Sequence, residues 1–232
     1  MSVNTYSPLL VVGPSGSGKS TSLENLDPAT TAILNIERKP LPFMGDFPLE
    51  VQINEAAQLK GIQFPKAVKD PAVKVIVIES FTEFCILHKK FCEKTKQGYD
   101  IFKAYAAGVF EFLQSIKNVK DKFVVVLSQD EYYDIIAADG ALVSQRVAAI
   151  LEGKAIRGKV EPNFATVAFT VVTGAGKTRK HNFTTYSDGI TTAKAPKAMD
   201  MPELVDNDVD ALLGRMATLW GLDYKTRGQR AS

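Results

Sequence analysis

The chain has 232 residues, of which 45% are hydrophobic and 23% are charged, as in an ordinary globular protein with a sizeable core. A disordered chain would be poorer in apolar residues and further from neutrality. The formal net charge is only +2, which excludes a strongly basic protein. Any nucleic-acid site must therefore use charge gathered on one loop or tail.

The sequence predicts a cytoplasmic protein that does not enter a membrane. No segment reaches the roughly 18 consecutive apolar residues of a spanning helix, and the N-terminus lacks the pattern of a secretory signal. Cys85 and Cys92 lie seven residues apart on one expected helix, about 10 Å along its axis, which is too far for a disulfide. The cysteines and histidines also lack the spacing of a zinc site.

The first half of the chain alternates short apolar runs with helical patterns. Strands are expected at residues 8–12, 31–36, 73–78 and 123–127. Helices are expected at residues 19–26, 81–95 and 99–117. Continuous β-branched runs suit strands that are buried on both faces, so this alternation predicts an α/β fold with a mostly parallel sheet flanked by helices.

The last third of the chain predicts antiparallel strands. A strand is expected at 164–172, and shorter strands at 181–186 and 190–193 flank Ser187-Asp188-Gly189, a hairpin signal in which glycine supplies a positive φ. These strands are expected to extend one edge of the sheet near the C-terminus.

A closing helix is expected at 207–219, where Asn207 or Asp208 serves as the N-terminal cap. No internal repeat or low-complexity linker divides the chain. Residues 1–222 are therefore expected to form one domain, and residues 223–232 a basic, disordered tail.

A glycine-rich motif follows the first expected strand. Residues 13–20 match G-x-x-x-x-G-K-[ST] in full, between a strand and a helix. Glycines let the backbone turn its N–H groups toward phosphate oxygens, and the helix N-terminus adds partial positive charge. Lys19 is expected to reach the β- and γ-phosphates of ATP, and the Ser20 hydroxyl to ligate Mg²⁺. The residues expected to bind the nucleotide are Gly13, Pro14, Ser15, Gly16, Ser17, Gly18, Lys19, Ser20 and Thr21.

A second glycine-rich stretch, residues 174–178, matches this motif only in part. Val171 stands where the first glycine would be needed, and the segment leads into a hairpin pattern. We interpret it as a basic turn. Its Lys177, Arg179 and Lys180 are either solvated or in contact with DNA or a neighbouring subunit.

Polar side chains end three of the expected parallel strands, at the edge of the sheet where ligands bind. Glu79 follows the third strand and is a candidate to orient Mg²⁺. Glu37 follows the second strand, and Gln129 the fourth, where its amide is a candidate sensor of the γ-phosphate. Asp130 is a weaker candidate for that role. The alternative for each is a surface polar residue just past a strand.

The order of these features resembles the core of RecA-type recombinases. The P-loop, a glutamate at position 37, V-I-V-I-E-S at 75–80 and L-S-Q at 127–129 carry the resemblance. It implies a RecA-like P-loop fold with Glu37 as the water-activating glutamate, Glu79 with Ser80 as the Walker B pair, and Gln129 as the sensor. The family usually has aspartate at the position of Glu79, so this departure implies slow turnover or water-mediated Mg²⁺ binding.

A narrower resemblance is to the phage AAA-type ATPases of the Sak group. Residues 34–43, 151–156 and 192–196, followed by Asp206-Asn207-Asp208, carry it, and it spans most of residues 8–220. Proteins of this group are RecA-like and are linked to single-strand annealing and phage recombination. The resemblance implies single-stranded DNA as a partner, a single-strand-binding protein as a further partner, and the host cytoplasm as the location.

The resemblance also implies a homo-oligomer, a ring or filament in which lysines of the adjacent subunit complete each site. Lys194 and Lys197 lie in the matching late hairpin and are candidates for that role. DNA would bind the loops after the third and fourth strands. The second of these, residues 130–162, holds aromatic and basic side chains that suit a single strand: Tyr132, Tyr133, Arg146, Lys154, Arg157 and Lys159.

Alternatives to this interpretation remain. Residues 143–151 fit an ordinary amphipathic helix, the tyrosines fit core packing, and the lysines between 89 and 96 fit a solvated helix face. At the level of function, the alternatives are a small-molecule kinase and a non-hydrolysing, ATP-dependent DNA-loading factor. A GTPase and an ABC-type ATPase are disfavoured, because the chain has neither N-K-x-D nor L-S-G-G-Q.

Overall fold

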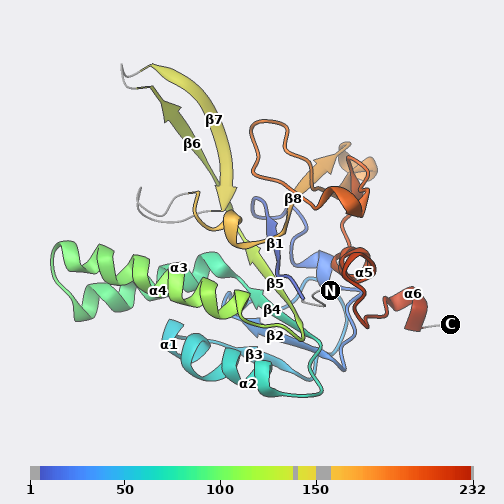
Figure 1. Cartoon of the computed structure of the whole chain (residues 1–232), viewed down its shortest axis with the longest axis horizontal. Coiled ribbons are helices and arrows are strands. Elements are labelled where there is room, and N and C mark those ends of the chain that lie inside the picture. Colours follow the sequence, from blue (N-terminus) through green and yellow to red (C-terminus); the bar gives the residue numbers. More distant parts are fainter. Residues whose placement is uncertain (1–5, 138–140, 150–157, 231–232) are drawn as a thin grey trace.

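The computed structural model describes residues 6–137, 141–149 and 158–230. Most strands lie in one sheet (Figure 1). These strands are β1 (Leu9–Val12), β2 (Thr31–Asn35), β3 (Glu50–Gln52), β4 (Val75–Glu79), β5 (Phe123–Ser128), β8 (Thr166–Thr173), β9 (Lys180–Thr184) and β10 (Val205–Asp206).

The strand order is β10-β9-β8-β1-β5-β4-β2-β3. The six strands from β8 to β3 pair in parallel, and β9 and β10 extend the β8 edge in antiparallel fashion. The expected α/β class, with a mostly parallel sheet and antiparallel edge strands near the C-terminus, is confirmed. The β3 strand has only three residues, and the sequence did not predict it.

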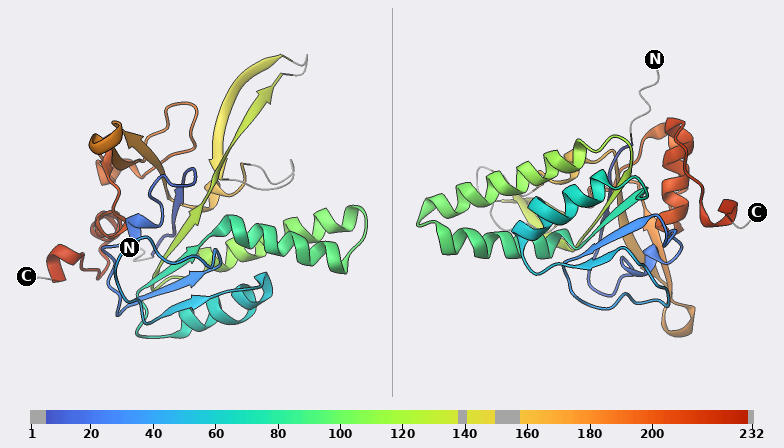
Figure 2. Two further views of the ribbon diagram at one scale, coloured as in Figure 1. Left: turned by 180° about the vertical axis from the view of Figure 1, so that it is seen from behind. Right: turned by 90° about the horizontal axis from the view of Figure 1, so that it is seen from below.

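Helices cover both faces of the sheet (Figure 2). The longer helices are α3 (Phe81–Thr95), α4 (Tyr99–Lys117) and α5 (Val209–Trp220). The short ones are α1 (Ala56–Gln58), η2 (Leu59–Gln63), α2 (Phe64–Lys69), η1 (Thr21–Leu23), η3 (Glu161–Asn163), η4 (Gly176–Thr178), η5 (Lys197–Met199) and α6 (Arg227–Arg230). Both α3 and α4 begin and end where the sequence predicts.

The two faces of the sheet bury two hydrophobic clusters, because successive side chains of a strand point to opposite sides. On β1, Leu10 and Val12 join the cluster beneath α1–α4, whereas Leu9 and Val11 join the cluster beneath α5. The α3 N-terminus is capped by Ser80, whose hydroxyl accepts the N–H of Glu83, and the α5 N-terminus by Asp208, which accepts that of Ala211.

A second, two-stranded sheet projects from the C-terminal end of β5 (Figure 1). It consists of β6 (Asp130–Ile136) and β7 (Leu142–Ala149), paired antiparallel. The alternative of a helix at 143–151 is therefore wrong as far as Ala149. The same residues alternate across a strand, and cross-strand pairing with β6 overrides the weak helical periodicity.

Two further expectations differ from the structure. The segment expected as a helix from residue 19 makes only the single 3₁₀ turn η1, and Pro28 limits any extension because the residue before a proline disfavours the helical region. The hairpin joins β8 to β9 around η4 rather than lying at Ser187–Gly189. At Ser187–Gly189 the Asp188 carboxylate instead accepts the N–H groups of Ile190 and Thr191, which forms a local turn.

The basic tail, residues 223–232, makes contacts with the body of the chain over the residues that the structure describes. Arg230 forms an ion pair with the buried Asp210 of α5 at 3.1 Å, and Arg227 donates its Nη1–H to Asn25 Oδ1. Asp210 also accepts the Tyr224 hydroxyl at 2.6 Å. Asp210 also accepts the backbone N–H of Arg227, so a buried carboxylate with three partners holds the tail against α5. Among the described residues, no helix has the length and apolarity to cross a membrane.

Candidate functional site

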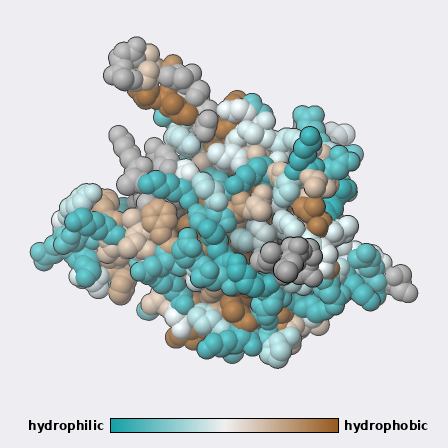
Figure 3. Space-filling model, in the orientation of Figure 1, coloured by the Kyte–Doolittle hydropathy of each residue, from teal (hydrophilic) through white to brown (hydrophobic). Residues whose placement is uncertain are grey.

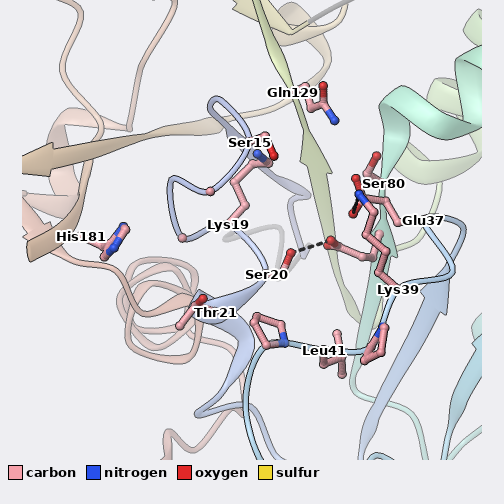
Figure 4. Close-up of a pocket in the computed structure, with 15 residues that line it drawn as sticks. Ser15, Lys19, Ser20, Thr21, Glu37, Lys39, Leu41, Ser80, Gln129 and His181 are labelled. Carbon is pink, nitrogen blue, oxygen red and sulfur yellow. Dashed lines mark hydrogen bonds and ion pairs between the residues drawn. The ribbon is translucent and has the colours of Figure 1, made fainter.

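A cavity of about 320 Å³ lies where the parallel strands end, beside the glycine-rich loop of residues 13–20 (Figure 4). The loop follows β1, and the Gly13 N–H donates to the carbonyl of Ser128 at the end of β5. Ligands of open α/β sheets bind at this edge. The lining combines loop residues with the ends of β2, β4 and β5: Ser15, Gly16, Gly18, Lys19, Ser20, Thr21, Glu37, Lys39, Glu79, Ser80 and Gln129.

The loop backbone has the form of an anion cradle. Gly16 and Gly18 adopt φ values of 73° and 100°, a region that side chains other than glycine rarely enter. Within the described residues, no protein acceptor lies within hydrogen-bonding distance of the N–H groups of Gly16, Gly18 and Lys19. Unpaired donors in a concave turn suit the oxygens of a phosphate.

Gly13 is required for a different reason, the close approach of β8. A Cβ on Gly13 would lie 1.8 Å from the Thr170 Oγ1 and 2.9 Å from the Ser17 Oγ. We therefore expect Gly13→Ala to displace the loop and weaken nucleotide binding at least tenfold, as measured by titration with a fluorescent ATP analogue. Gly61→Ala is the matched control, since a Cβ there meets nothing within 4 Å. Wild-type affinity in the Gly13 variant would contradict this reading of the loop.

The outer side of the loop is held by side chains from the C-terminal half of the chain. Thr170 donates its hydroxyl to Ser17 Oγ at 2.7 Å, and Asn207 donates its amide to the Gly18 carbonyl at 2.8 Å. His181 Nδ1 lies 2.8 Å from the Ser17 carbonyl oxygen, and His181 also lines the cavity. No local sequence pattern marks these contacts, because the pairing of β8, β9 and β10 brings the three side chains to the loop.

Among the basic residues of the turn at 174–180, Arg179 contacts the protein itself. Its Nη2 donates to the Gly16 carbonyl oxygen at 3.4 Å, so it contacts the glycine-rich loop of its own chain. Lys177 and Lys180 are exposed.

Lys19 points across the loop (Figure 4) and is largely buried. Its Nζ donates to the carbonyl oxygens of Gly13 at 2.6 Å and Pro14 at 2.9 Å. Burial lowers the pKa of the ammonium, and the nearby carboxylate of Glu79 opposes that shift. The loop's own carbonyls thus keep a cation at the position where phosphate charge would be received.

Ser20, labelled in Figure 4, lines the cavity together with Glu79. The Ser20 hydroxyl donates to Glu79 Oε1 at 2.7 Å, whereas Oε2 is buried and, among the described residues, without a hydrogen-bond partner. Burial raises the pKa of Glu79 to about 7, and the charge of Glu37 adds to the shift. An unsatisfied carboxylate oxygen beside a hydroxyl is a donor set that fits a hard cation such as Mg²⁺.

Glu37 and Gln129 line the same cavity as this pair, at the ends of their strands. The N–H groups of Ile36 and Glu37 both donate to the Glu79 carbonyl, which ties the end of β2 to the end of β4. Glu37 Oε2 lies 3.5 Å from the exposed Lys39 ammonium. The Gln129 N–H donates to Thr82 Oγ1 at 2.9 Å, while its side chain reaches the cavity. The side chains of Glu37, Glu79 and Gln129 all line one cavity.

Other predicted residues lie elsewhere. Lys194 does not line the cavity. Its backbone pairs with Val167, and burial lowers the pKa of its ammonium. Lys197 lies in η5 rather than in a hairpin. Gly13, Pro14 and Ser17 form the loop without lining the cavity. Of the proposed DNA contacts, Tyr132 is exposed on β6, Tyr133 is half-buried, and Lys159 is exposed. Lys154 and Arg157, like the Arg146 side chain, lie outside the described part of the chain.

Comparison with known proteins finds similarity only among solved structures. No family model matches the chain. No curated protein matches it either. The RadB recombinase is 15% identical over 77% of this chain and 80% of its own, with a TM-score of 0.46. A KaiC-like protein from Pyrococcus horikoshii is 10% identical over 78% and 79%, with a TM-score of 0.47. The flagellar accessory protein FlaH from Methanocaldococcus jannaschii is 9% identical over 86% and 84%, with a TM-score of 0.40.

Proposed function

We propose that this chain binds ATP with Mg²⁺ in the cavity beside residues 13–20 and hydrolyses it. The observation that carries the proposal is the contact between Ser20 Oγ and the buried Glu79 carboxylate, which faces a loop with unpaired N–H groups. In P-loop proteins this pairing of a hydroxyl with a strand-end acid holds the magnesium ion that accompanies the phosphates. When bound, Mg²⁺ would neutralise charge on the β- and γ-phosphates.

Each residue of the site has a distinct task in this proposal. The unpaired N–H groups of Gly16, Gly18 and Lys19 receive the phosphate oxygens, and the Lys19 ammonium leaves the loop carbonyls to contact the β- and γ-phosphates. Glu37 accepts a proton from the attacking water, for which its position at the cavity wall is suited. Gln129 contacts the γ-phosphate and transmits its loss to β6, which begins one residue later.

The protonation of Glu79 accounts for the slow turnover that we propose. With its pKa near 7, this carboxyl is about half protonated at neutral pH, and it must lose that proton before it can serve a cation. Binding of Mg²⁺ and proton release are then coupled. A shorter, less buried acid would have a smaller rise in pKa, so less proton release would accompany Mg²⁺ binding.

We further propose that the chain acts on single-stranded DNA as a homo-oligomer, a ring or filament of the cytoplasm, in phage recombination or annealing. Support comes from the sequence resemblance to RecA-type and Sak-group ATPases. In this proposal Lys194 reaches the site of the adjacent subunit, consistent with its position away from its own cavity. Residues 1–222 form the ATPase domain. A single-strand-binding protein is a further proposed partner.

Phosphate release tests the proposal directly. We expect slow ATP turnover that depends on Mg²⁺ and rises severalfold on addition of single-stranded DNA. Duplex DNA of equal length is the matched control. A turnover rate that is unchanged by DNA but rises with a nucleoside monophosphate would establish the kinase alternative. Tight ATP binding without turnover, with or without DNA, would establish the non-hydrolysing loading factor.

A further inference from the structure

Two hairpins project from the body of the molecule with opposite charge. One is the end of the α3–α4 helical hairpin, residues 89–103, and the other is the β6–β7 hairpin, residues 130–149 (Figures 1 and 2). By sequence, residues 89–103 hold five lysines against one glutamate and one aspartate, a net charge of +3. Residues 130–149 hold four acids and one arginine, a net charge of −3. The two net charges are equal in size and opposite in sign, so the hairpins are electrostatically complementary.

Both hairpins also expose large apolar side chains. Of the twelve large hydrophobic residues that are exposed in the described chain, half lie on these two elements. They are Phe91, Tyr99, Phe102, Tyr132, Ile136 and Leu142, each 51–72% exposed. Figure 3 shows hydrophobic colour along the described part of the β6–β7 hairpin. Exposed apolar residues that cluster among charges are typical of protein interfaces.

The β6–β7 hairpin has one face suited to contact. Tyr132, Asp134 and Ile136 alternate along β6, so all three lie on the same, exposed side of the ribbon. A two-stranded ribbon that leaves the body is only marginally stable in water by itself. Its negative charge disfavours a polyanion such as DNA as the molecule that covers it. A basic, partly apolar surface is what complements it.

The α3–α4 hairpin provides such a surface. Lys90, Lys94 and Lys96 are exposed, and among the described residues none of them makes an ion pair. Gly108 lets the helices pack closely, because a Cβ there would overlap the His88 ring. His88 stacks on Phe84 and on Phe91, which fixes the exposed Phe91 ring. The surface is therefore a rigid one, with aromatic rings set among lysines.

We propose that the β6–β7 hairpin of one copy docks on the α3–α4 hairpin of the next, in a head-to-tail interface between identical chains. This interface rests on the proposed homo-oligomer and identifies the two surfaces that would join its subunits. The hairpins leave the body on the same side and diverge (Figure 1), so they do not cover each other within one chain. Two different patches that bind each other repeat without limit, or close when the rotation permits, which produces a filament or a ring.

Variants that break one surface at a time test the interface. The helix variant is Lys94→Glu with Lys96→Glu, and the hairpin variant is Tyr132→Lys with Asp134→Lys. Lys66→Glu with Lys69→Glu on α2 is the charge-matched control, and circular dichroism checks the folding of all three. Mass photometry with Mg-ATP should show wild-type and control assemblies. Each interface variant alone should be monomeric, with apparent dissociation constants raised at least tenfold.

Mixing the two interface variants gives the decisive result. Each keeps one intact surface, so an equimolar mixture should form one-to-one dimers and nothing larger. Assembly of either variant at wild-type strength, a wild-type protein that stays monomeric, or a mixture without dimers would overturn the interface. So would a helix variant that assembles normally but loses single-stranded DNA, since the lysines would then bind nucleic acid. Unchanged ATP affinity in these variants would leave the nucleotide site intact, which separates the two proposals.

Discussion

Replacing Lys19 with alanine is expected to reduce ATP turnover by about a hundredfold to a thousandfold, the effect of removing one preorganised donor from a charge-developing site. The largely buried Lys19 ammonium is the cation that faces the loop interior, and it already bonds to the carbonyls of Gly13 and Pro14. ATP affinity should fall as well, because the cavity loses the positive charge nearest the loop. Phosphate release and titration with a fluorescent nucleotide measure the two effects.

The matched control is Lys177→Ala in the turn between β8 and β9. Lys177 is exposed and does not line the cavity, so its loss should leave both affinity and rate within about twofold of wild type, as expected for surface charges that are screened by solvent. A Lys19→Ala protein with unaltered ATP affinity and rate would show that the loop of residues 13–20 does not receive the phosphates.

The sequence predicted the parts of this site that depend on local pattern. Glu37, Glu79 and Gln129 follow buried strands, and parallel strands bring their C-terminal ends to one edge of the sheet. The motif at 13–20 was likewise recognisable because it needs glycine at defined positions, and Gly16 and Gly18 do adopt positive φ. Both inferences use only short-range sequence and the geometry of a parallel sheet.

Features that depend on long-range pairing were missed. His181 and Asn207 reach the loop only because β9 pairs with β8 and β10 pairs with β9, and nothing in their local sequence marks this. For the residues of β7 the sequence also allows a helix, because their apolar positions fit both a helical and a strand periodicity. Pairing with β6 selects the strand. The contact between Arg230 in the basic tail and the buried Asp210 of α5 is likewise a long-range one that composition does not indicate.

Replacing Glu79 with glutamine is expected to stabilise the nucleotide-free protein above neutral pH while nearly abolishing turnover. Burial raises the pKa of Glu79 from 4.5 to about 7 in the folded chain. Between these two values the folded state holds a proton that the unfolded state has lost, so the free energy of unfolding falls as pH rises through this window. The contribution is about 3 kcal/mol, present below pH 4.5 and lost above about pH 7.

Glutamine cannot ionise, so the variant should lack this part of the pH dependence. Urea unfolding at pH 5 and pH 8, without nucleotide or Mg²⁺, should show the variant gaining up to about 3 kcal/mol over wild type between the two conditions. Glu24→Gln, at an exposed position outside the cavity, is the control, and other carboxylates cancel because both proteins share them. An equal pH dependence in the Glu79 variant and wild type would contradict the raised pKa. A buried carboxylate that lowers stability when it ionises fits a site that is completed by a cation. Mg-ATP should therefore stabilise wild type more than the glutamine variant.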